Sequence, residues 1–439
     1  MFIYLYSDSN LEYNQSNRII PKDQQKHRRM KRFKQIKYLV FVVVVLILAW
    51  ISPFLWGLIS DKATYYPFTY YSSVNHKFCS LNFKNDKVTR TDVDGNIYTE
   101  NQWDSILPLL SYRQLAANGL LPDSLNGVPI ALNQIRATNY YYRYSPKNLF
   151  SPSIPLYPLF ESMSGRVDLE LPGDVFRTTK NGVEFLDPKT NKVLVSKSEK
   201  YSKALRKKGF VGPEKWTAGT PTIQKAYDQG YFILDQNSNL FHFKRVNNKP
   251  FVRKIDLPNG IEPIYMATTE YGDKRSYGFV IDKNSQLYVL STNNYKFIHI
   301  PVQFNYKTNK LVLMANMFYW NFGITSKNGK TYYAIDAKNF NVIDTFKYDK
   351  VSNKYSEISK YVFPFKLRFK SYNDGYIKPR FFIGSIYSLL TNLFFVLLFI
   401  VIKRIQKTKS SAIAILGVAT TGIYGFIAAI ILKLNRENS

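Results

Sequence analysis

The stretch Asp235-Gln-Asn-Ser-Asn-Leu-Phe241 decides the fold of the largest part of this 439-residue chain, because it recurs. In each copy a turn of Asp, Asn, Ser or Gly residues separates two runs of apolar and aromatic residues, the order of a β-hairpin. Similar stretches begin at Asp92, Asp187, Asp282 and Ser326. The last four starts are 44 to 48 residues apart. Such a period is typical of β-propeller blades.

The segments between these turns are short runs rich in Tyr, Phe, Val and Ile, which favour strands. The interval from Asp92 to Asp187 is twice as long as the others, so we expect a degenerate unit near Tyr140-Tyr-Tyr142. We therefore predict a mainly β, propeller-like domain of roughly 45-residue repeats over residues 60–378. Hairpins of a β-sandwich use the same turns and remain the alternative.

Two short helical insertions interrupt the β pattern. Residues 99–119 begin with Thr99 as a cap and carry apolar residues at helical spacing, with Pro108 expected to bend or split the helix. Residues 199–209 form a second, basic helix that ends at Gly209.

Three apolar stretches flank this domain, at residues 38–59, 381–402 and 411–432. Each has the roughly 20 residues that a helix needs to cross a bilayer, so we predict three transmembrane helices. The first is too long for the core of a cleaved signal peptide and is interpreted as a signal anchor.

Clustered cations predict the orientation of these spans. Residues 1–37 hold nine Lys and Arg against three Asp and Glu, and residues 403–410 hold four cations. Because such clusters stay in the cytoplasm, residues 60–378 and the tail 433–439 are expected outside it. The resulting location is a bacterial inner membrane with a periplasmic main domain. Met30, followed directly by Lys31 and Arg32, is an alternative start to Met1.

Small and polar residues in the last two spans predict close helix packing. Small side chains let backbones approach, and hydroxyl or amide groups can hydrogen-bond between helices. The residues expected at this contact are Ser385, Ser388 and Asn392 in the second span and Gly417, Thr421, Gly425 and Ala429 in the third. They pack either within the hairpin or against helices of a partner. No Asp, Glu, Lys or Arg lies in the middle of any span, which argues against an ion path.

The excess of cations extends over the central domain, where residues 60–378 hold 44 Lys and Arg against 27 Asp and Glu. This charge favours anionic partners such as lipid headgroups or acidic glycans, with a solvated surface as the alternative. Nucleic acid is excluded as a partner by the predicted placement outside the cytoplasm. The candidate binding residues are Lys203, Arg206 and Lys207 of the basic helix, the charged group Glu161, Arg166 and Asp168, and Arg113.

The sequence offers little support for metal or catalytic chemistry. Cys79 is the single cysteine and the four histidines are scattered, so neither a disulfide nor a metal site is expected. Gly95 stands at position four after Asp92 rather than at position six, which excludes an EF-hand loop. No nucleotide-binding motif and no nucleophile elbow is present, and we expect no cofactor.

Several longer runs resemble one known family. They are Leu156-Tyr-Pro-Leu-Phe-Glu-Ser-Met-Ser-Gly-Arg-Val-Asp-Leu-Glu-Leu-Pro172, Ser111-Tyr-Arg-Gln-Leu115, Leu121-Pro-Asp-Ser124, Tyr201-Ser-Lys-Ala-Leu-Arg-Lys-Lys-Gly-Phe210 and Tyr227-Asp-Gln-Gly-Tyr-Phe-Ile-Leu-Asp235. By these runs the chain resembles the membrane-protein family of Bacteroidota described as domain of unknown function 4857. The resemblance covers nearly all of the chain after Met30. It implies no particular activity, and it favours a role beside ABC-transporter components.

The predicted function is a non-enzymatic accessory or sensor subunit of an inner-membrane complex, of ABC-exporter type. Its external domain is expected to bind a partner or an anionic envelope ligand, and its helices are expected to contact membrane lipids and other subunits. The alternative is a membrane-anchored envelope enzyme acting on a glycan or lipid, with its site at the propeller axis.

Overall fold

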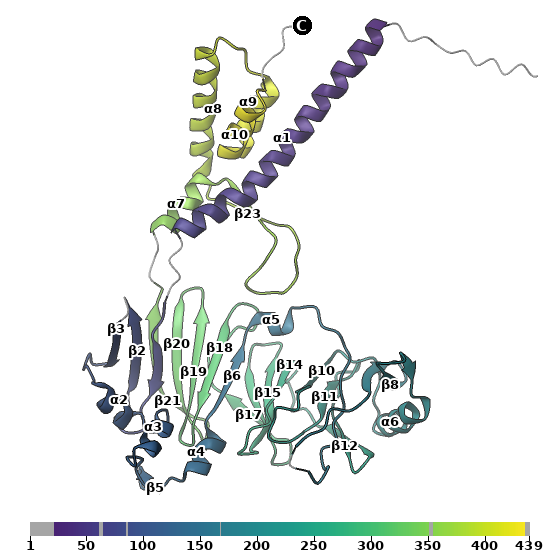
Figure 1. Ribbon diagram of the computed structural model, residues 1–439, viewed down its shortest axis with the longest axis vertical. Helices are drawn as coiled ribbons and strands as arrows, with labels where there is room; N and C mark the ends of the chain where they lie inside the picture. Colours follow the sequence, from purple (N-terminus) through teal and green to yellow (C-terminus); the bar gives the residue numbers. More distant parts are fainter. Residues whose placement is uncertain (1–21, 61–64, 85–86, 167, 351–353, 435–439) are drawn as a thin grey trace, which may run out of the picture. The chain divides into compact units, whose positions relative to one another are not determined.

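A computed structural model describes residues 22–60, 65–84, 87–166, 168–350 and 354–434. The chain divides into two units. The β unit comprises residues 63–352 and 370–377, and the helical unit comprises residues 1–62, 353–369 and 378–439 (Figure 1). The predicted N-terminal segment 1–37 and tail 433–439 thus lie partly outside the described residues.

Three successive antiparallel sheets form the centre of the β unit. Their strands are β10 Trp216–Gly219, β11 Tyr231–Leu234, β12 Leu240–Val246 and β13 Lys249–Ile255; β14 Pro263–Thr268, β15 Ser276–Asp282, β16 Leu287–Ser291 and β17 Phe297–Ile300; and β18 Lys310–Ala315, β19 Tyr319–Ser326, β20 Gly329–Asp336 and β21 Val342–Asp349. Within β10–β13, β14–β17 and β18–β21, neighbouring strands follow one another in the chain. Each of the predicted repeats from Asp235 onward therefore supplies four consecutive strands to one sheet.

Residues 140–142, which were expected to form a degenerate repeat, belong to the last sheet instead. Strand β6 (Tyr140–Tyr144) pairs antiparallel with β18 and is the fifth strand of the last sheet. This strand precedes β18 by more than 160 residues in the chain, yet it covers the edge of β18. A local repeat pattern does not reveal such a distant pairing.

Two three-stranded sheets and several short elements complete the β unit. The strands are β1 Phe68–Tyr71, β2 Phe78–Lys84 and β3 Lys87–Asp92, then β7 Val175–Thr179, β8 Gly182–Asp187 and β9 Lys192–Val193, with the small hairpin β4 Ser124–Leu125 and β5 Val128–Pro129. The helices are α2 Glu100–Ile106, α3 Tyr112–Ala117, α4 Leu132–Thr138, α5 Pro146–Leu149 and α6 Val195–Lys207. The first predicted insertion is thus split into α2 and α3, and Thr99 caps α2 together with Gln102.

In the repeated turns the Asp side chain accepts hydrogen bonds from backbone amides, and these bonds hold the hairpin together. Asp235 Oδ1 accepts a hydrogen bond from the amide of Asn239 at 2.8 Å, and Asp282 Oδ1 accepts one from Gln286 at 2.8 Å. These turns, with those at Asp187 and Ser326, join the second and third strands of their sheets. The turn at Asp92 instead follows the third strand of the first sheet. Because the Asp oxygens are engaged by the turn itself, the motif is structural.

Both faces of the central strands are buried, each in a different core. In β11 the side chains of Tyr231 and Ile233 lie in a core with β7, β8 and α6, whereas Phe232 and Leu234 lie in a core with β14–β16. Strand β15 alternates in the same way, since Phe279 and Ile281 pack toward β18–β20. Because successive side chains of a strand point to opposite faces, one sheet packs against the sheet before it and the sheet after it.

The predicted β-rich domain is confirmed, whereas its closure into a propeller is not. The described residues form several separate open sheets, and no closed barrel or ring of blades is found among them.

The helical unit contains a long helix α1 (Lys22–Ser60), a short helix α7 (Lys354–Val362), the hairpin of β22 (Phe365–Arg368) and β23 (Arg380–Ile383), and helix α8 (Ser388–Ile405). Among the described residues two helical segments, Gln35–Ser60 and Ser388–Ile405, are long and apolar enough to cross a membrane. The second begins at Ser388 rather than at residue 381, because residues 380–383 pair with β22.

The third predicted span is not one helix. It consists of α9 (Ala412–Thr421) and α10 (Ile423–Ile431), separated by Gly422, whose φ of 58° and ψ of −127° end the first helix. At 1.5 Å per residue α9 is about 15 Å long, half of what a bilayer core requires. The two helices fold back on one another, since a Cβ at Gly425 would lie 2.7 Å from the carbonyl oxygen of Gly417.

Both ends of this helical hairpin lie beside the same part of α1. The Tyr38 and Ser411 hydroxyls are 3.4 Å apart, and Lys37 Nζ donates to the carbonyl of Lys433 at 3.3 Å. The segment therefore returns to the end of α1 from which it starts. The prediction of a third membrane-crossing helix over residues 411–432 is therefore not confirmed, because apolar length alone does not reveal a turn at Gly422.

The predicted packing residues are divided between several contacts. Asn392 of α8 donates from Nδ2 to the carbonyl of Ala419 in α9 at 3.0 Å. A Cβ at Gly417 would lie 2.7 Å from the ring of Phe41, so this glycine admits α1 rather than α8. Thr421 Oγ1 donates to the carbonyl of Gly417, and Ala429 is buried on α10. Ser385 and Ser388 lie at the start of α8 and line a groove there.

Candidate functional site

A groove between α6 and the β12–β13 hairpin brings cations from two elements together. Its volume is about 580 Å³. The residues that line it are Leu194, Val195, Ser196, Lys197, Lys200, Tyr201, Arg245 and Asn248.

Helix α6 lies here because it completes the sheet of β7–β9. The Ser202 hydroxyl accepts from the amide of Val183 at 3.0 Å and donates to its carbonyl at 2.9 Å. The Ser198 hydroxyl accepts from the amide of Phe185 at 2.9 Å. These serines satisfy the free edge of β8, as another strand would, while Tyr201 and Leu205 are buried in the core. The opposite face of α6 is left to charged residues.

The groove cations are held in place by local partners. Lys197 pairs with Asp174 at 2.6 Å, Lys200 donates to the carbonyl of Asn248 at 2.9 Å, and Arg245 lies 3.1 Å from Glu161. Three ammonium or guanidinium groups against two carboxylates leave a positive groove. These partners neutralise part of the charge and restrain the three long side chains, which line the groove.

Glu161 is the carboxylate partner of Arg245 and is not itself among the residues that line the groove. Burial alone would raise its pKa, but the amides of Asn248 and Asn247, at 2.9 and 2.7 Å, outweigh that effect together with Met163 and Arg245, and its pKa is lowered. Glu161 is therefore a carboxylate that fixes the β12–β13 turn and orients Arg245.

The other residues predicted for binding are dispersed. Arg166 is exposed and pairs with Glu170 rather than with Glu161, and Asp168 is exposed beside it. Arg113 on α3 contacts the ring and hydroxyl of Tyr112. The sequence placed Glu161, Arg166 and Asp168 in one cluster because they are neighbours in the chain, but Glu161 turns toward a strand more than 80 residues away.

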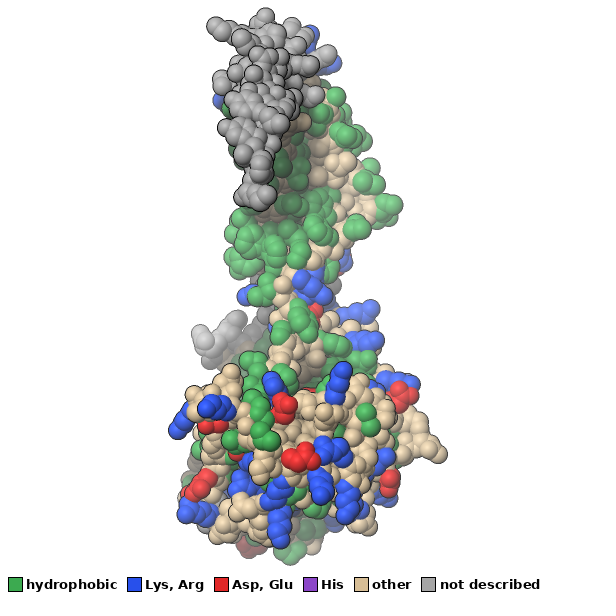
Figure 2. Space-filling view, turned by 90° about the vertical axis from the view of Figure 1, so that its right-hand side faces the viewer, with side chains coloured by type: hydrophobic (Ala, Val, Ile, Leu, Met, Phe, Trp, Pro, Cys, Tyr) green, Lys and Arg blue, Asp and Glu red, His purple; other side chains and the backbone are tan. Residues whose placement is uncertain are grey.

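Lys203, Arg206 and Lys207 remain on the exposed face of α6. Arg206 pairs with Glu199 at 2.5 Å and donates to the carbonyl of Asn181 at 2.8 Å. Figure 2 shows the side of the β unit on which α6 lies, with Lys and Arg side chains gathered over it. Residues 192–208 contain seven cations and one acid. The groove thus opens on a surface of positive charge.

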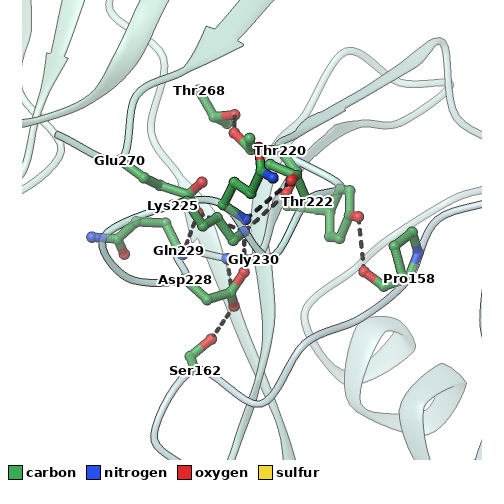
Figure 3. A network of polar contacts seen from close by, with 12 residues as sticks. Pro158, Ser162, Thr220, Thr222, Lys225, Asp228, Gln229, Gly230, Thr268 and Glu270 are labelled. Atoms are coloured by element: carbon green, nitrogen blue, oxygen red, sulfur yellow. Dashed lines mark hydrogen bonds and ion pairs between the residues drawn. The ribbon is translucent and has the colours of Figure 1, made fainter. Parts of the chain in front are cut away.

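A second polar cluster is buried between the loop 158–162 and the sheets of β10–β13 and β14–β17 (Figure 3). Lys225 Nζ lies 2.6 Å from Asp228 and 3.0 Å from Glu270, and it donates to the carbonyl of Thr220 at 2.9 Å. The three side chains are 4%, 0% and 2% exposed. Ser162 donates to the other oxygen of Asp228 at 2.5 Å.

This network is a structural connection rather than a reaction centre. Ser162 donates to a carboxylate that already holds Lys225 and the amide of Gly230, so its hydroxyl is not placed against a free base. Desolvation raises the pKa of Glu270, opposed by Lys225. Sequence analysis missed the network because Lys225, Asp228 and Glu270 read as ordinary loop residues, and only the packing of two sheets buries them.

His242 lies beside this network and yields a prediction on pH. Its Nε2 donates to the carbonyl of Gln229 at 2.6 Å, because a carbonyl can only accept, and its Nδ1 accepts from Tyr295 at 2.7 Å. Burial lowers the pKa of His242 to about 3, from an ordinary value near 6.5. Because the pKa of His242 is lower in the folded than in the unfolded chain, its contribution to stability is complete above about pH 6.5 and decreases as the pH falls toward 3.

We expect the His242 contribution to stability to fall by about 1.4 kcal/mol per pH unit below pH 6.5, or about 2 kcal/mol by pH 5. The measurement is the free energy of unfolding of the β unit in urea at pH 5 to 7, for the parent chain and for His242→Gln. The variant is expected to be less stable at pH 7 and to have a shallower slope. Equal slopes would show that His242 is not the titrating group.

The sequence pattern of domain of unknown function DUF4857 matches residues 68–335. The chain belongs to this family. A search of curated proteins finds no match. Among solved structures the chain is similar to PorZ, a bacterial surface component of the type-IX secretion system of Porphyromonas gingivalis, with 11% identity and a TM-score of 0.22. The match covers 67% of this chain and 28% of PorZ, so the chain spans less than a third of that protein.

Proposed function

We propose that this member of the DUF4857 family is a membrane-anchored accessory or sensor subunit whose β unit binds an anionic ligand in the α6 groove. The observation that carries the proposal is the convergence of Lys197, Lys200 and Arg245, from a helix and a strand, on one groove within a cationic surface. Anions bind where several oriented N–H donors converge, and the surrounding charge raises the rate of encounter.

The proposal places α1 and α8 in a bacterial inner membrane, with the β unit on the periplasmic side. Their apolar length and the cations in the N-terminal part of α1 support this placement. Exposed apolar residues along α8, such as Leu390, Phe394 and Leu397, then face lipid or helices of another subunit. We propose that these partners include ABC-type transporter components. We also propose that the stacked sheets of the β unit have a propeller-like arrangement. Recovery of transporter subunits with the chain from gently solubilised membranes would support the partner assignment.

Binding at the groove is tested on the full chain in a neutral detergent. The probes are inorganic triphosphate and an oligosaccharide of uronic acids, titrated separately at 0.15 M salt. Replacing Lys197 and Lys200 by Gln is expected to weaken binding at least about 10-fold, since each charge-assisted hydrogen bond contributes about 1.5–3 kcal/mol. The matched control replaces Lys203 and Lys207, which lie on the same helix outside the groove, and should change affinity by less than about threefold.

Equal losses in the two double variants would show diffuse attraction to the basic face and would overturn the groove assignment. Unchanged binding in both would overturn it as well. The buried thiol of Cys79 provides the check of folding, because it is inaccessible to a maleimide while the β unit is folded.

A further inference from the structure

Cations from three segments of the chain meet at one end of the helical unit, where α8 ends and α9 begins. They are Lys37 of α1, Arg404 in the last turn of α8, Lys407 and Lys409 of the loop that follows, and Lys433 after α10. We call these five residues the inner cationic cluster. The last four are exposed, and Lys37 is half-buried.

The fold of the helical hairpin brings these cations together. Lys37 Nζ donates to the carbonyl of Lys433 at 3.3 Å, so the end of the hairpin lies against α1. The hydroxyls of Tyr38 and Ser411 are 3.4 Å apart, and Ser411 follows Lys409 by two residues. Residues 37, 409 and 433, which are distant in the chain, therefore place their charges at the same end of the unit.

The described residues around the cluster supply no acidic partner for it. Residues 24–60, 354–369 and 378–434 contain one acidic residue, Glu357. Glu357 pairs with Lys360 on α7 at 2.7 Å. It lies before α8, whose 18 residues span about 27 Å, whereas the cluster lies at the other end of that helix. Like charges held close together repel one another, and an anion bound among them relieves this repulsion.

Exposed apolar side chains continue from the cluster toward the middle of the unit. Helix α9 begins at the cluster, and its residues Ile413 and Leu416 are 53% and 64% exposed. The next residue, Gly417, lies against the ring of Phe41, which is one turn after Lys37 on α1. Charged groups at the end of the unit and apolar groups one to two turns further in match the order of headgroup and acyl chain in one leaflet of a bilayer.

We propose that the inner cationic cluster binds one anionic phospholipid of the cytoplasmic leaflet. The phosphate lies among Lys37, Lys409 and Lys433, at the end of the helices. An acyl chain runs inward from it along Ile413 and Leu416 of α9. The cluster selects a headgroup with net negative charge, because a zwitterionic headgroup brings a cation of its own to a site that has no acid. The inference rests on the membrane placement in the proposed function and is independent of the α6 groove.

Lipid binding is tested by native mass spectrometry of the full chain after delipidation, with phosphatidylglycerol and phosphatidylcholine of identical acyl chains. We expect one retained phosphatidylglycerol and a preference for it of at least about 10-fold. The double variant Lys409→Gln with Lys433→Gln should reduce this preference to less than about threefold, because each cation near the membrane surface strengthens attachment to anionic lipid about fivefold. The matched control, Lys360→Gln with Arg368→Gln, removes the same charge from exposed positions of the helical unit outside the cluster and should leave the preference intact.

Two further measurements keep the test decisive if the double variant fails to fold. Lys409→Gln and Lys433→Gln should each weaken the preference about fivefold when introduced singly. An excess of inorganic phosphate should not displace the lipid, since free phosphate has no acyl chain.

Equal retention of the two lipids by the parent chain would overturn the proposal. Equal losses in the two double variants would overturn it as well, because they would show diffuse attraction by all cations of the unit. Displacement by inorganic phosphate would show a site for a free anion instead of a lipid. Extraction of the chain from membranes by alkaline carbonate would refute the membrane placement, a failure distinct from that of the lipid site.

Discussion

Replacing Lys225 by methionine is expected to destabilise the β unit by about 3–5 kcal/mol, the largest effect of any single substitution proposed for this unit. Lys225 is the one cation in direct contact with the carboxylates of Asp228 and Glu270 among the described residues, and all three side chains are at most 4% exposed. Methionine fits the same length of chain but leaves two acidic groups buried without their partner. Removing one member of such a group costs more than the attraction itself supplies.

The measurement is the rate of maleimide labelling of Cys79 across a urea series. Cys79 is the single cysteine, it is fully buried, and burial raises its pKa to about 12, so labelling reports unfolding of the β unit without added probes. Lys215→Met is the matched control, because Lys215 donates to Ser238 on the exposed surface, and its expected effect is within about 0.5 kcal/mol.

A triple variant separates charge from packing. If Asp228→Asn and Glu270→Gln are combined with Lys225→Met, the uncompensated charge is removed and much of the stability should return. A Lys225→Met protein as stable as the Lys215→Met control would show that the buried charges do not hold the two sheets and the loop 158–162 together.

The second large effect concerns the side of the membrane on which the chain ends. Three spans would place the end of the chain opposite to the N-terminus, whereas the hairpin of α9 and α10 brings Lys433 back beside Lys37. We therefore expect alkaline phosphatase fused after Leu434 to be inactive and a fluorescent protein at the same site to fluoresce, as both report a cytoplasmic end. The phosphatase fusion is expected to be fully active in one topology and inactive in the other.

The matched fusion follows α1, with phosphatase joined after Tyr66. It is expected to be active, because the basic residues in the N-terminal part of α1 hold that end in the cytoplasm and one crossing reaches the other side. An active phosphatase after Leu434 would contradict the hairpin and restore a third span. Inactivity at both positions would mean that α1 itself does not cross.

Local interactions explain which features of the fold were predictable. The turn at Asp282 appears in the sequence because its Asp accepts hydrogen bonds from amides two and four residues later, a contact that requires no other part of the chain. The cap at Thr99 is equally local. The apolar length of residues 38–59 also suffices to predict helix α1 there.

The candidate sites were predicted only in part, because their partners are distant in the chain. Charge density identified the basic helix, but the groove needs Arg245 and Asn248 from a strand that packs beside it. Glu161 was identified from its charged neighbours, although its partner is Arg245. Lys225 and Glu270 were not identified, because each is polar and unremarkable until two sheets meet around it.

The sequence by itself determined the β-rich repeats, the apolar helices and the excess of positive charge, because periodicity, length and composition are properties of neighbouring residues. The tertiary structure decided which cations share a groove, which charges are buried together, and that residues 411–434 fold back at Gly422. These outcomes depend on the close approach of distant segments, where a missing Cβ or a buried carboxylate selects one arrangement among those that the local pattern allows.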